Sequence, residues 1–300
     1  METTDLNTGQ PRKIGGFATR IGLLIGTNMA VIALFTVIAS IFGVDPQGLL
    51  GLAVFSALFG FGGSFISLAM SKKIAKRSTG AVVIEAPAND TERWLVNTVA
   101  RLSKDAGIDT PEVAVFDSPI PNAFATGAKR NDALVAVSVG LMQQMKPAEI
   151  EAVLAHEVAH VANGDMVTLT LIQGVVNTFV ILISRILANV IVSVITKDRG
   201  GAGIYFIVVM ILQVVLGFFA TMIVMWFSRR REFRADEGSG QLTSNPQMVA
   251  ALQALQRQHV EGELPDEVAA FGIRPSKAQG VRKLFSSHPP LEERIAALQR

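Results

Sequence analysis

The chain has 300 residues, of which 50% are apolar and only 17% are charged, and its mean hydropathy is +0.41. Soluble domains usually carry about 25% charged residues, so this composition excludes an ordinary soluble protein and indicates segments that lie in lipid. The formal net charge of +2 gives no reason to expect a nucleic-acid partner. The chain contains no cysteine, which excludes disulfides, thiolate metal sites and a cysteine nucleophile.

Four uncharged stretches are long enough to cross a bilayer as helices, which takes about 18 to 20 apolar residues. In chain order they are 21–44, 48–70, 166–184 and 200–228. The first is too long, and too closely followed by the second, to be a cleaved signal peptide, so we expect it to be retained. The sequence therefore predicts a membrane protein with four transmembrane helices.

Basic residues gather at three places beside these stretches. They precede the first, follow the second and follow the fourth: Arg12, Lys13, Arg20, Lys72, Lys73, Lys76, Arg77, Arg229, Arg230, Arg231 and Arg234. By the positive-inside rule, both termini and the polar region between the second and third stretches face the cytoplasm. The link between the third and fourth stretches, which contains Lys197 and Arg199, would lie outside the cytoplasm and would be an exception to this rule. Arg185, just after the third stretch, either extends to the outer membrane surface or indicates that this helix is tilted and partly shielded by protein; the first interpretation is favoured.

The polar residues between the second and third stretches have the periodicities of an α+β domain. Helical spacing of apolar residues predicts a helix over 91–104, and valine-rich segments predict strands over 112–116 and 133–139. With 122–126 as a further short strand, we expect a small antiparallel sheet of about three strands backed by helices.

Two separated polar segments must then assemble one cytoplasmic domain. The predicted parts are a cytoplasmic N-terminus (1–20), a hairpin of two spans (21–70), the first part of the domain (71–165), a second hairpin (166–228) and the second part of the domain (229–300).

The segment at residues 147–161 carries the most informative pattern. Its proline suits a first helical turn and its apolar residues recur at helical spacing, so we expect a helix. Within it, His156, Glu157 and His160 form H-E-x-x-H, whose i,i+4 spacing places both imidazoles on one face, where they can chelate one zinc ion. Glu157 lies on the adjacent flank, where it can act as general base toward a metal-bound water. The alternative is a chance histidine pair on an amphipathic helix.

A catalytic zinc of this kind needs three protein ligands. The extended motif with a third histidine fails, because Met166 occupies that position. Glu232 is the favoured distant ligand, since Asp236 follows at i,i+4 and can hydrogen-bond a metal-binding histidine. The alternative is that both acids only neutralise adjacent arginines. Less favoured ligands are Glu237, His259 and His288.

The order of the spans gives an independent test of this pairing. The histidine pair lies about six residues before the third span, and Glu232 lies about four residues after the fourth. They can bind one metal only if the chain crosses the membrane an even number of times between them, and the length of 166–228 favours two crossings. We therefore expect the site at the cytoplasmic surface of the membrane.

Several motifs in the same order resemble the HtpX-type membrane zinc metalloproteases, bacterial relatives of the CAAX prenyl protease. They are P-N-A-F-A-T-G at 121–127, H-E-V-A-H-V-A-N-G-D-M at 156–166, R-R-R-E-F-R-A-D at 229–236 and S-H-P-P-L-E-E-R at 287–294. The resemblance implies a gluzincin-like fold, one zinc ion per chain held by His156, His160 and Glu232, and Glu157 as the catalytic base.

The resemblance also implies roles outside the metal motifs. It indicates an edge strand that binds substrate peptide by strand addition, formed by Asn122, Ala123, Phe124, Ala125 and Thr126. His288 and Arg294 resemble a C-terminal pair near the active site, with catalytic roles in stabilising the oxyanion and orienting the zinc-binding glutamate. From the residues alone, the segment at His288 is equally an ordinary helix start. Asn163 and Asp165 also match, although polar residues that end a helix at the bilayer surface would look the same.

The predicted function is a zinc endopeptidase of the bacterial inner membrane, facing the cytoplasm. By resemblance, its substrates are misfolded or damaged membrane proteins, and its role is quality control under envelope stress. The partners are thus polypeptides and the lipid bilayer, without nucleic acid; the sequence does not give an oligomeric state. One alternative is a transporter, for which Arg185 is the only clear charge in the spans. Another is a zinc-bound scaffold without catalysis, against which the intact Glu157 argues.

Overall fold

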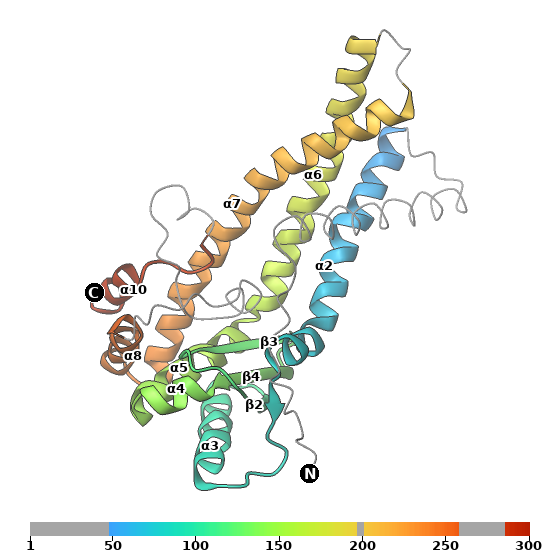
Figure 1. Cartoon of the computed structure of the whole chain (residues 1–300). Helices are drawn as coiled ribbons and strands as arrows, with labels where there is room; N and C mark the ends of the chain where they lie inside the picture. The colour runs from blue at the N-terminus through green and yellow to red at the C-terminus, as the bar shows by residue number, and fades with distance from the viewer. Residues whose placement is uncertain (1–47, 197–200, 258–285) are drawn as a thin grey trace, which may run out of the picture. The chain divides into compact units, whose positions relative to one another are not determined.

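Figure 1 shows the computed structural model, which describes residues 48–196, 201–257 and 286–300. The chain divides into two compact units, Met1–Phe55 and Ser56–Arg300, and the contacts described below lie within the second. The predicted span at 21–44 lies outside the described residues.

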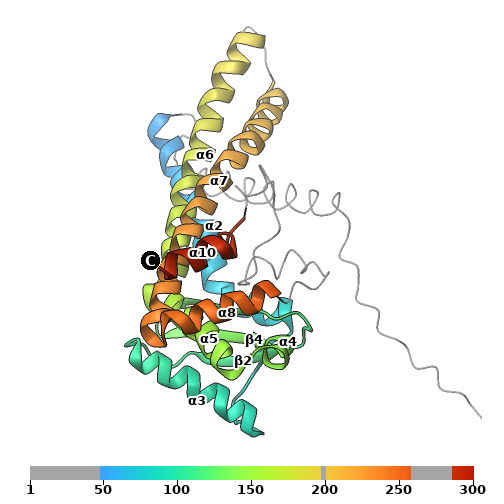
Figure 2. The ribbon, with the colours of Figure 1, turned by 90° about the vertical axis from the view of Figure 1, so that its left-hand side faces the viewer.

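Within these described ranges, three helices are long and apolar enough to cross a membrane. They are α2 (Leu49–Thr79), α6 (Asp165–Thr196) and α7 (Ala202–Leu242). They correspond to the second, third and fourth predicted spans. α6 and α7 pack side by side as an antiparallel hairpin (Figures 1 and 2).

Both helices of this hairpin are longer than their predicted spans. The predicted end of the third span at Ser184 is too early, because Arg185 and the residues after it remain helical to the end of α6. Arg185 therefore lies inside the helix and not at its outer end, and it interacts electrostatically with Tyr205 of α7. α7 likewise continues through the basic segment after Ser228. The reason is that arginine interrupts a hydropathy pattern but has a good helix propensity.

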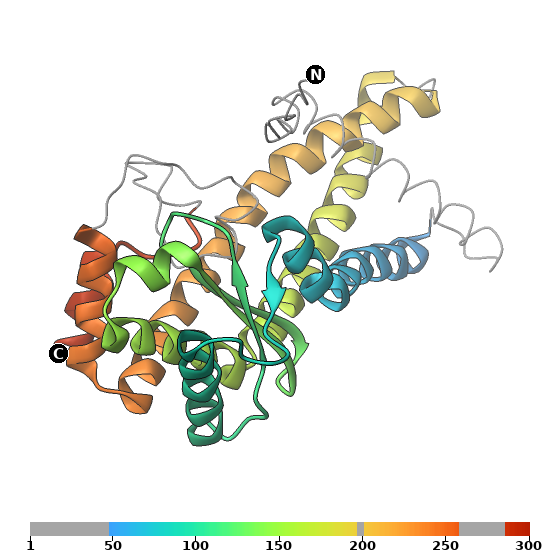
Figure 3. The same cartoon turned by 60° about the horizontal axis from the view of Figure 1, so that its bottom comes forward.

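The sheet has four strands in the order β1-β2-β4-β3. Their bounds are Val82–Val83 for β1, Glu112–Phe116 for β2, Ala123–Lys129 for β3 and Asp132–Ser138 for β4. β3 and β4 form an antiparallel hairpin, but β2 and β4 pair in parallel. The expected antiparallel sheet of about three strands is therefore wrong. In the chain β3 comes between β2 and β4, but in the sheet it lies at the edge, on the far side of β4 (Figure 3). Because β3 runs opposite to both of them, β4 runs in the same direction as β2.

The two faces of the sheet pack against different helices, because alternate residues of a strand point to opposite faces. On one face, Ala123 and Val135 share a core with α3 (Asp90–Asp105) and α5 (Pro147–Asn163). On the other face, Phe124 packs in a smaller cluster with Ala75 of α2. The helices predicted at 91–104 and 147–161, and the strand predicted at 112–116, are confirmed to within two residues at each end.

The residues after α7 join the same core as the residues before α6. α4 (Val139–Gln144) leads from the sheet to α5, while α8 (Asn245–Arg257) and α10 (Leu291–Leu298) follow α7. Met248 and Leu252 of α8 are buried in the core that contains α5, and α8 lies alongside α5 in Figure 2. The two segments on either side of the α6–α7 hairpin therefore fold together.

Candidate metal centre

Helix α5 carries the two histidines on one buried face. Pro147 occupies its first turn, the Glu149 carboxylate accepts a 2.9 Å hydrogen bond from the backbone N–H of Lys146 at its N-terminus, and Gly164 ends it in the left-handed conformation at φ 68°. His156 is 0% exposed and His160 5%, and their Nε2 atoms lie 3.1 Å apart. The i,i+4 spacing thus brings the two imidazoles together as predicted.

The other ring nitrogen of each histidine faces a carboxylate. His156 Nδ1 lies 3.0 Å from Asp236 Oδ1, and His160 Nδ1 lies 2.6 Å from Asp165 Oδ2. A carboxylate accepts hydrogen bonds, so each Nδ1 carries the proton and donates it, which leaves the two Nε2 lone pairs facing a common point.

Glu232 of α7 completes this group. Its side chain is fully buried, with Oε1 3.4 Å from His160 Nε2 and Oε2 3.6 Å from His156 Nε2. One ligand atom from each of these three residues fits within 4.8 Å, and Glu232 Oε1 has no hydrogen-bond partner among the described residues. An orphaned carboxylate oxygen and two imidazole nitrogens that converge in a buried place fit a cation, and two imidazoles with one carboxylate suit zinc among other divalent ions.

Close packing of α7 on α5 positions Glu232. A Cβ atom at Gly238 would lie 2.8 Å from the Cβ of Ala159, so only glycine allows the two helices to approach this closely. Ser239 Oγ, one residue further, donates a 2.7 Å hydrogen bond to the carbonyl of Ala152. The two helices are therefore fixed against each other within two turns of the ligands.

The acids around the histidines favour their protonated forms when no cation is bound. Burial lowers the pKa of His160, but the charge of Glu232 and the hydrogen bond with Asp165 outweigh it and raise that pKa to about 9. The pKa of His156 is also raised, since hydrogen bonds with Asp236 and Glu232 outweigh its burial. Metal binding requires neutral imidazoles, so a metal ion entering this group displaces protons.

His288 and Arg294 lie against Glu232 and Asp236 of α7. His288 Nδ1 is 2.7 Å from Glu232 Oε2. Arg294, 0% exposed, donates from Nε and Nη2 to the two carboxylate oxygens of Asp236 at 2.8 and 2.6 Å. Its Nη1 lies 3.7 Å from Glu232 Oε2 and has no hydrogen-bond partner among the described residues. Burial lowers the pKa of Arg294, but the negative charge of Asp236 more than compensates and raises it.

Helix α5 carries Glu157 and also contacts the predicted substrate strand. Glu157 is 4% exposed, and no described group donates a hydrogen bond to it. Of the segment 122–126, Asn122 precedes β3 and the other four residues lie in it; all five are buried, and β3 packs on α5. β3 is an edge strand, and no described strand pairs with its outer side.

Two residues near the site were not assigned a role from the sequence. Asp165 holds His160, and Arg234 Nη2 donates a 3.1 Å hydrogen bond to the other Asp165 oxygen. The available signal was the Gly-Asp pair after the helix, since a left-handed glycine turns the next residue back toward the helix end. Among the less favoured ligands, Glu237 is exposed, His288 lies beside Glu232 and outside the ligand group, and His259 is outside the described residues.

Two histidines on one helix, a glutamate from a second helix and adjacent apolar helices define a membrane metallopeptidase. The chain belongs to peptidase family M48, whose model matches residues 89–300. It is 57% identical to Protease HtpX of Stenotrophomonas maltophilia (strain R551-3) over 94% of this chain and 98% of that protein. It is 58% identical to Protease HtpX of Xanthomonas euvesicatoria pv. vesicatoria over 93% of this chain and 97% of that protein. The predicted resemblance to HtpX-type proteases is confirmed.

A solved structure with a similar fold is the crystal structure of S. mikatae Ste24p. The TM-score is 0.64 with 19% sequence identity, over 94% of this chain and 65% of that chain. The likeness at this identity is one of fold.

Proposed function

We propose that the protein is a zinc-dependent endopeptidase of the bacterial inner membrane that acts on misfolded or damaged membrane proteins at the cytoplasmic surface. The observation that carries this proposal is the buried convergence of His156, His160 and Glu232 beside a glutamate in the position of a general base. The short path from His160 to α6, through Gly164 alone after the end of α5, supports a site close to the membrane.

The ligands are oriented by the chain before any metal binds. Asp165 and Asp236 hold the Nδ1 protons, so His156 and His160 bind through Nε2, and Glu232 supplies a carboxylate oxygen. When bound, zinc would polarise the scissile carbonyl group and make water more acidic.

Glu157 then acts as the general base and acid. Its carboxylate receives no hydrogen bond from the described residues, so its lone pairs are available to take a proton from the attacking water. The same oxygen returns the proton to the leaving amine, which completes hydrolysis of the peptide bond.

His288 and Arg294 support the reaction in two ways. The contact of His288 Nδ1 with Glu232 Oε2 orients the third ligand. Arg294 is fixed by Asp236, and its Nη1, which makes no hydrogen bond with the described residues, is available to the negative charge that develops on the substrate carbonyl oxygen.

Substrate binds as an extended segment along the outer edge of β3. The free edge of a strand offers backbone N–H and C=O groups to a peptide, independently of side-chain sequence. This mode suits a protease whose substrates share an unfolded state and no common motif.

The test is casein cleavage by the purified, zinc-loaded protein in detergent. Glu157→Ala should lower the rate by about 100-fold or more, because proton transfer is lost while the metal ligands stay. Glu151→Ala is the matched control, since Glu151 lies on the same helix but pairs with Arg101 at the surface. Equal rates for wild type and Glu157→Ala would refute the mechanism. Bound zinc without cleavage by the wild type would support a non-catalytic scaffold.

A further inference from the structure

One exposed face of α2 changes from apolar to cationic near the end of the helix. Ile66 is 63% exposed and Met70 46%, as expected of side chains that face lipid. Seven residues make almost two full turns of an α-helix, so Lys73 lies on the same face as Ile66. Arg77 is related to Met70 in the same way. The apolar face of this candidate membrane helix therefore ends in two cations.

The other two cations at this end of α2 have a structural role. Lys72 and Lys76 are turned toward the sheet and form ion pairs with its acids. Lys73 and Arg77 are exposed, and neither forms a hydrogen bond or an ion pair with the part of the chain that the structure describes. Their charges are therefore available to a partner.

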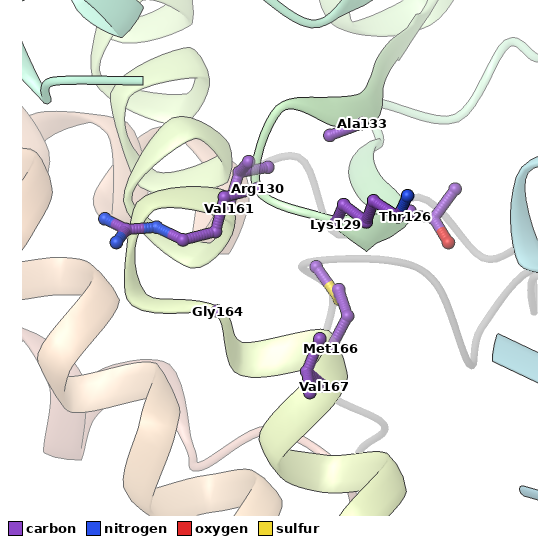
Figure 4. A pocket seen from close by; sticks show the side chains of 9 residues that line it. Thr126, Lys129, Arg130, Ala133, Val161, Gly164, Met166 and Val167 are labelled. Atoms are coloured by element: carbon purple, nitrogen blue, oxygen red, sulfur yellow. The ribbon is translucent and has the colours of Figure 1, made fainter. Parts of the chain in front are cut away.

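A second pair of cations lies in the turn between β3 and β4. Lys129 and Arg130 are exposed, and within the described ranges neither forms an ion pair with an acid. Figure 4 shows this turn across from Met166 and Val167, in the first turn of α6. Since α6 is a candidate membrane span from its first residue, the β3–β4 turn lies beside the place where a span begins.

Asp132, the first residue of β4, connects the two pairs of cations. It is paired with Lys129 across the turn, and its carboxylate accepts a 2.5 Å hydrogen bond from Lys72 of α2. The hydrogen bond from Lys72 lowers the pKa of Asp132, and the charges of Lys129 and Lys76 lower it further. The end of α2 and the β3–β4 turn therefore act on the same acid and form one continuous charged region.

The cations outnumber the acids in this region. The described acids are Glu112 and Asp132, which pair with lysines of α2, and Asp109, whose backbone N–H donates a 3.4 Å hydrogen bond to Asn131 in the turn. The described cations are Lys72, Lys73, Lys76, Arg77, Lys129 and Arg130. Six cations against three acids leave a net charge of +3, beside the ends of two candidate spans.

Membrane topology explains the cations of α2 but not those of the turn. The positive-inside rule counts basic residues within about 15 to 20 residues of the end of a span. Asp165, where the nearest candidate span begins, comes 35 residues after Arg130. Folding of the sheet, and not closeness in sequence, thus brings the turn to the membrane, which favours a direct contact with lipid.

We propose that Lys73, Arg77, Lys129 and Arg130 form a basic surface that binds the headgroups of anionic phospholipids. The helices place this surface where the phosphate groups of a bilayer lie, and each lysine or arginine near an anionic membrane strengthens binding by about 5-fold. Headgroups bound at the turn would hold the edge strand β3 at the membrane surface. The inference does not depend on the proposed catalytic mechanism.

The experiment is native mass spectrometry of the full chain in detergent, titrated with phosphatidylglycerol or with phosphatidylcholine of identical acyl chains. Identical chains make equal apolar contributions, so the ratio of the two affinities reports the headgroup alone. Phosphatidylglycerol has a net negative charge and phosphatidylcholine has none. The wild type should bind phosphatidylglycerol about 10- to 20-fold more tightly, as expected for one headgroup that contacts about two cations.

Two double variants connect this preference to the basic surface. Lys73→Gln with Arg77→Gln, and Lys129→Gln with Arg130→Gln, should each reduce the ratio by about 5-fold, and the quadruple variant should reduce it to about 2-fold or less. All four side chains are exposed, so thermal unfolding in detergent should stay within about 2 °C of the wild type. Because the pairs are tested separately, unfolding of one variant leaves the other decisive.

The matched control removes two exposed cations from α3, as Arg93→Gln with Lys104→Gln. α3 lies at the end of the sheet domain away from the three long helices (Figures 1 and 2), so this variant should keep the wild-type ratio. The loss of charge is the same as in each double variant of the basic surface, and only its location differs.

Equal affinities of the wild type for the two lipids would overturn the proposal. A preference that survives in the quadruple variant would also overturn it, as would an equal loss in the α3 control, which would make net charge alone responsible. Displacement of phosphatidylglycerol by millimolar inorganic phosphate would reveal a site for soluble phosphate and reject the lipid assignment.

Discussion

At the residue scale, the two histidines of the candidate metal centre are held by acids from different places in the chain. Asp236 comes from α7 and is itself held by the buried Arg294, whereas Asp165 follows Gly164 and is held by Arg234, whose side chain is 60% exposed. The two acids thus have the same role toward the metal but different surroundings.

Asp165→Asn and Asp236→Asn should each lower zinc affinity by about 10- to 100-fold, because each weakens the hydrogen bond that orients an imidazole. Only Asp236→Asn should also destabilise the fold strongly, by about 3 kcal/mol or more, since it leaves the fully buried Arg294 without its partner charge. Zinc-buffered titrations and thermal unfolding in detergent measure the two effects. Equal losses of stability in the two variants would contradict this account.

The sequence predicted the histidine pair but not all of the residues that hold it in place, and the reason is physical. His156 and His160 are four residues apart on one helix, so their proximity follows from local geometry alone. The role of Asp165 depends on the left-handed turn at Gly164, and that of Arg294 on folding of the C-terminal segment against α7, which no local spacing encodes.

At the scale of elements, α2 is attached to the sheet by charge as well as by packing. Lys72 Nζ lies 2.9 Å from Glu112 of β2 and 2.5 Å from Asp132 of β4, and Lys76 also pairs with Glu112. Ala75, between the two lysines, is fully buried in the cluster that contains Phe124 of β3. The end of a candidate membrane helix is therefore fixed to the sheet that carries the proposed substrate strand.

Lys72→Met should lower the midpoint of thermal unfolding at neutral pH by about 1 to 3 °C, because exposed ion pairs contribute little individually. The hydrogen bond from Lys72 lowers the pKa of Asp132, so this stabilisation is present above the ordinary pKa of Asp132 and is lost as pH falls through the lowered value. The difference between wild type and variant should shrink accordingly in acid.

Lys73→Met is the control for this effect. Lys73 is exposed on the same helix turn and forms no ion pair with a described residue, so its loss should leave the unfolding midpoint within about 1 °C. A difference for Lys72→Met that persists undiminished below pH 3 would show that packing of the lysine stem, and not the ion pairs, is responsible.

Elements were easier to predict than their arrangement. The valine-rich segment at Glu112–Phe116 and the amphipathic helix at Asp90–Asp105 follow from their own periodicities. The parallel pairing of β2 with β4 joins segments about twenty residues apart, and it is set by where the β3–β4 hairpin docks. Sequence periodicity carries no information on that choice, which explains the error in the predicted sheet.

At the scale of the whole molecule, the length of α7 allows one helix to hold both a candidate membrane span and two residues of the candidate metal centre. A rise of 1.5 Å per residue gives its 41 residues a length of about 60 Å, roughly twice the hydrocarbon thickness of a bilayer. One helix therefore carries both an apolar span and, beyond it, Glu232 and Asp236. Because α6 and α7 form a hairpin, the histidines before α6 and the glutamate in α7 reach the same end of it.

The proposed orientation places that end in the cytoplasm, and the absence of cysteine makes it directly measurable. Single cysteines can be introduced without removing others, by Arg199→Cys in the link between α6 and α7 and by Glu85→Cys before α3. A membrane-impermeant maleimide applied to cells with a permeabilised outer membrane should label Arg199→Cys at once, and Glu85→Cys only after the inner membrane is opened. If Arg199→Cys required lysis while Glu85→Cys did not, the metal centre would face the periplasm. If both required lysis, α6 and α7 would not cross the bilayer. The histidines and Glu232 would then lie on the same side of the membrane because the chain does not cross it between them.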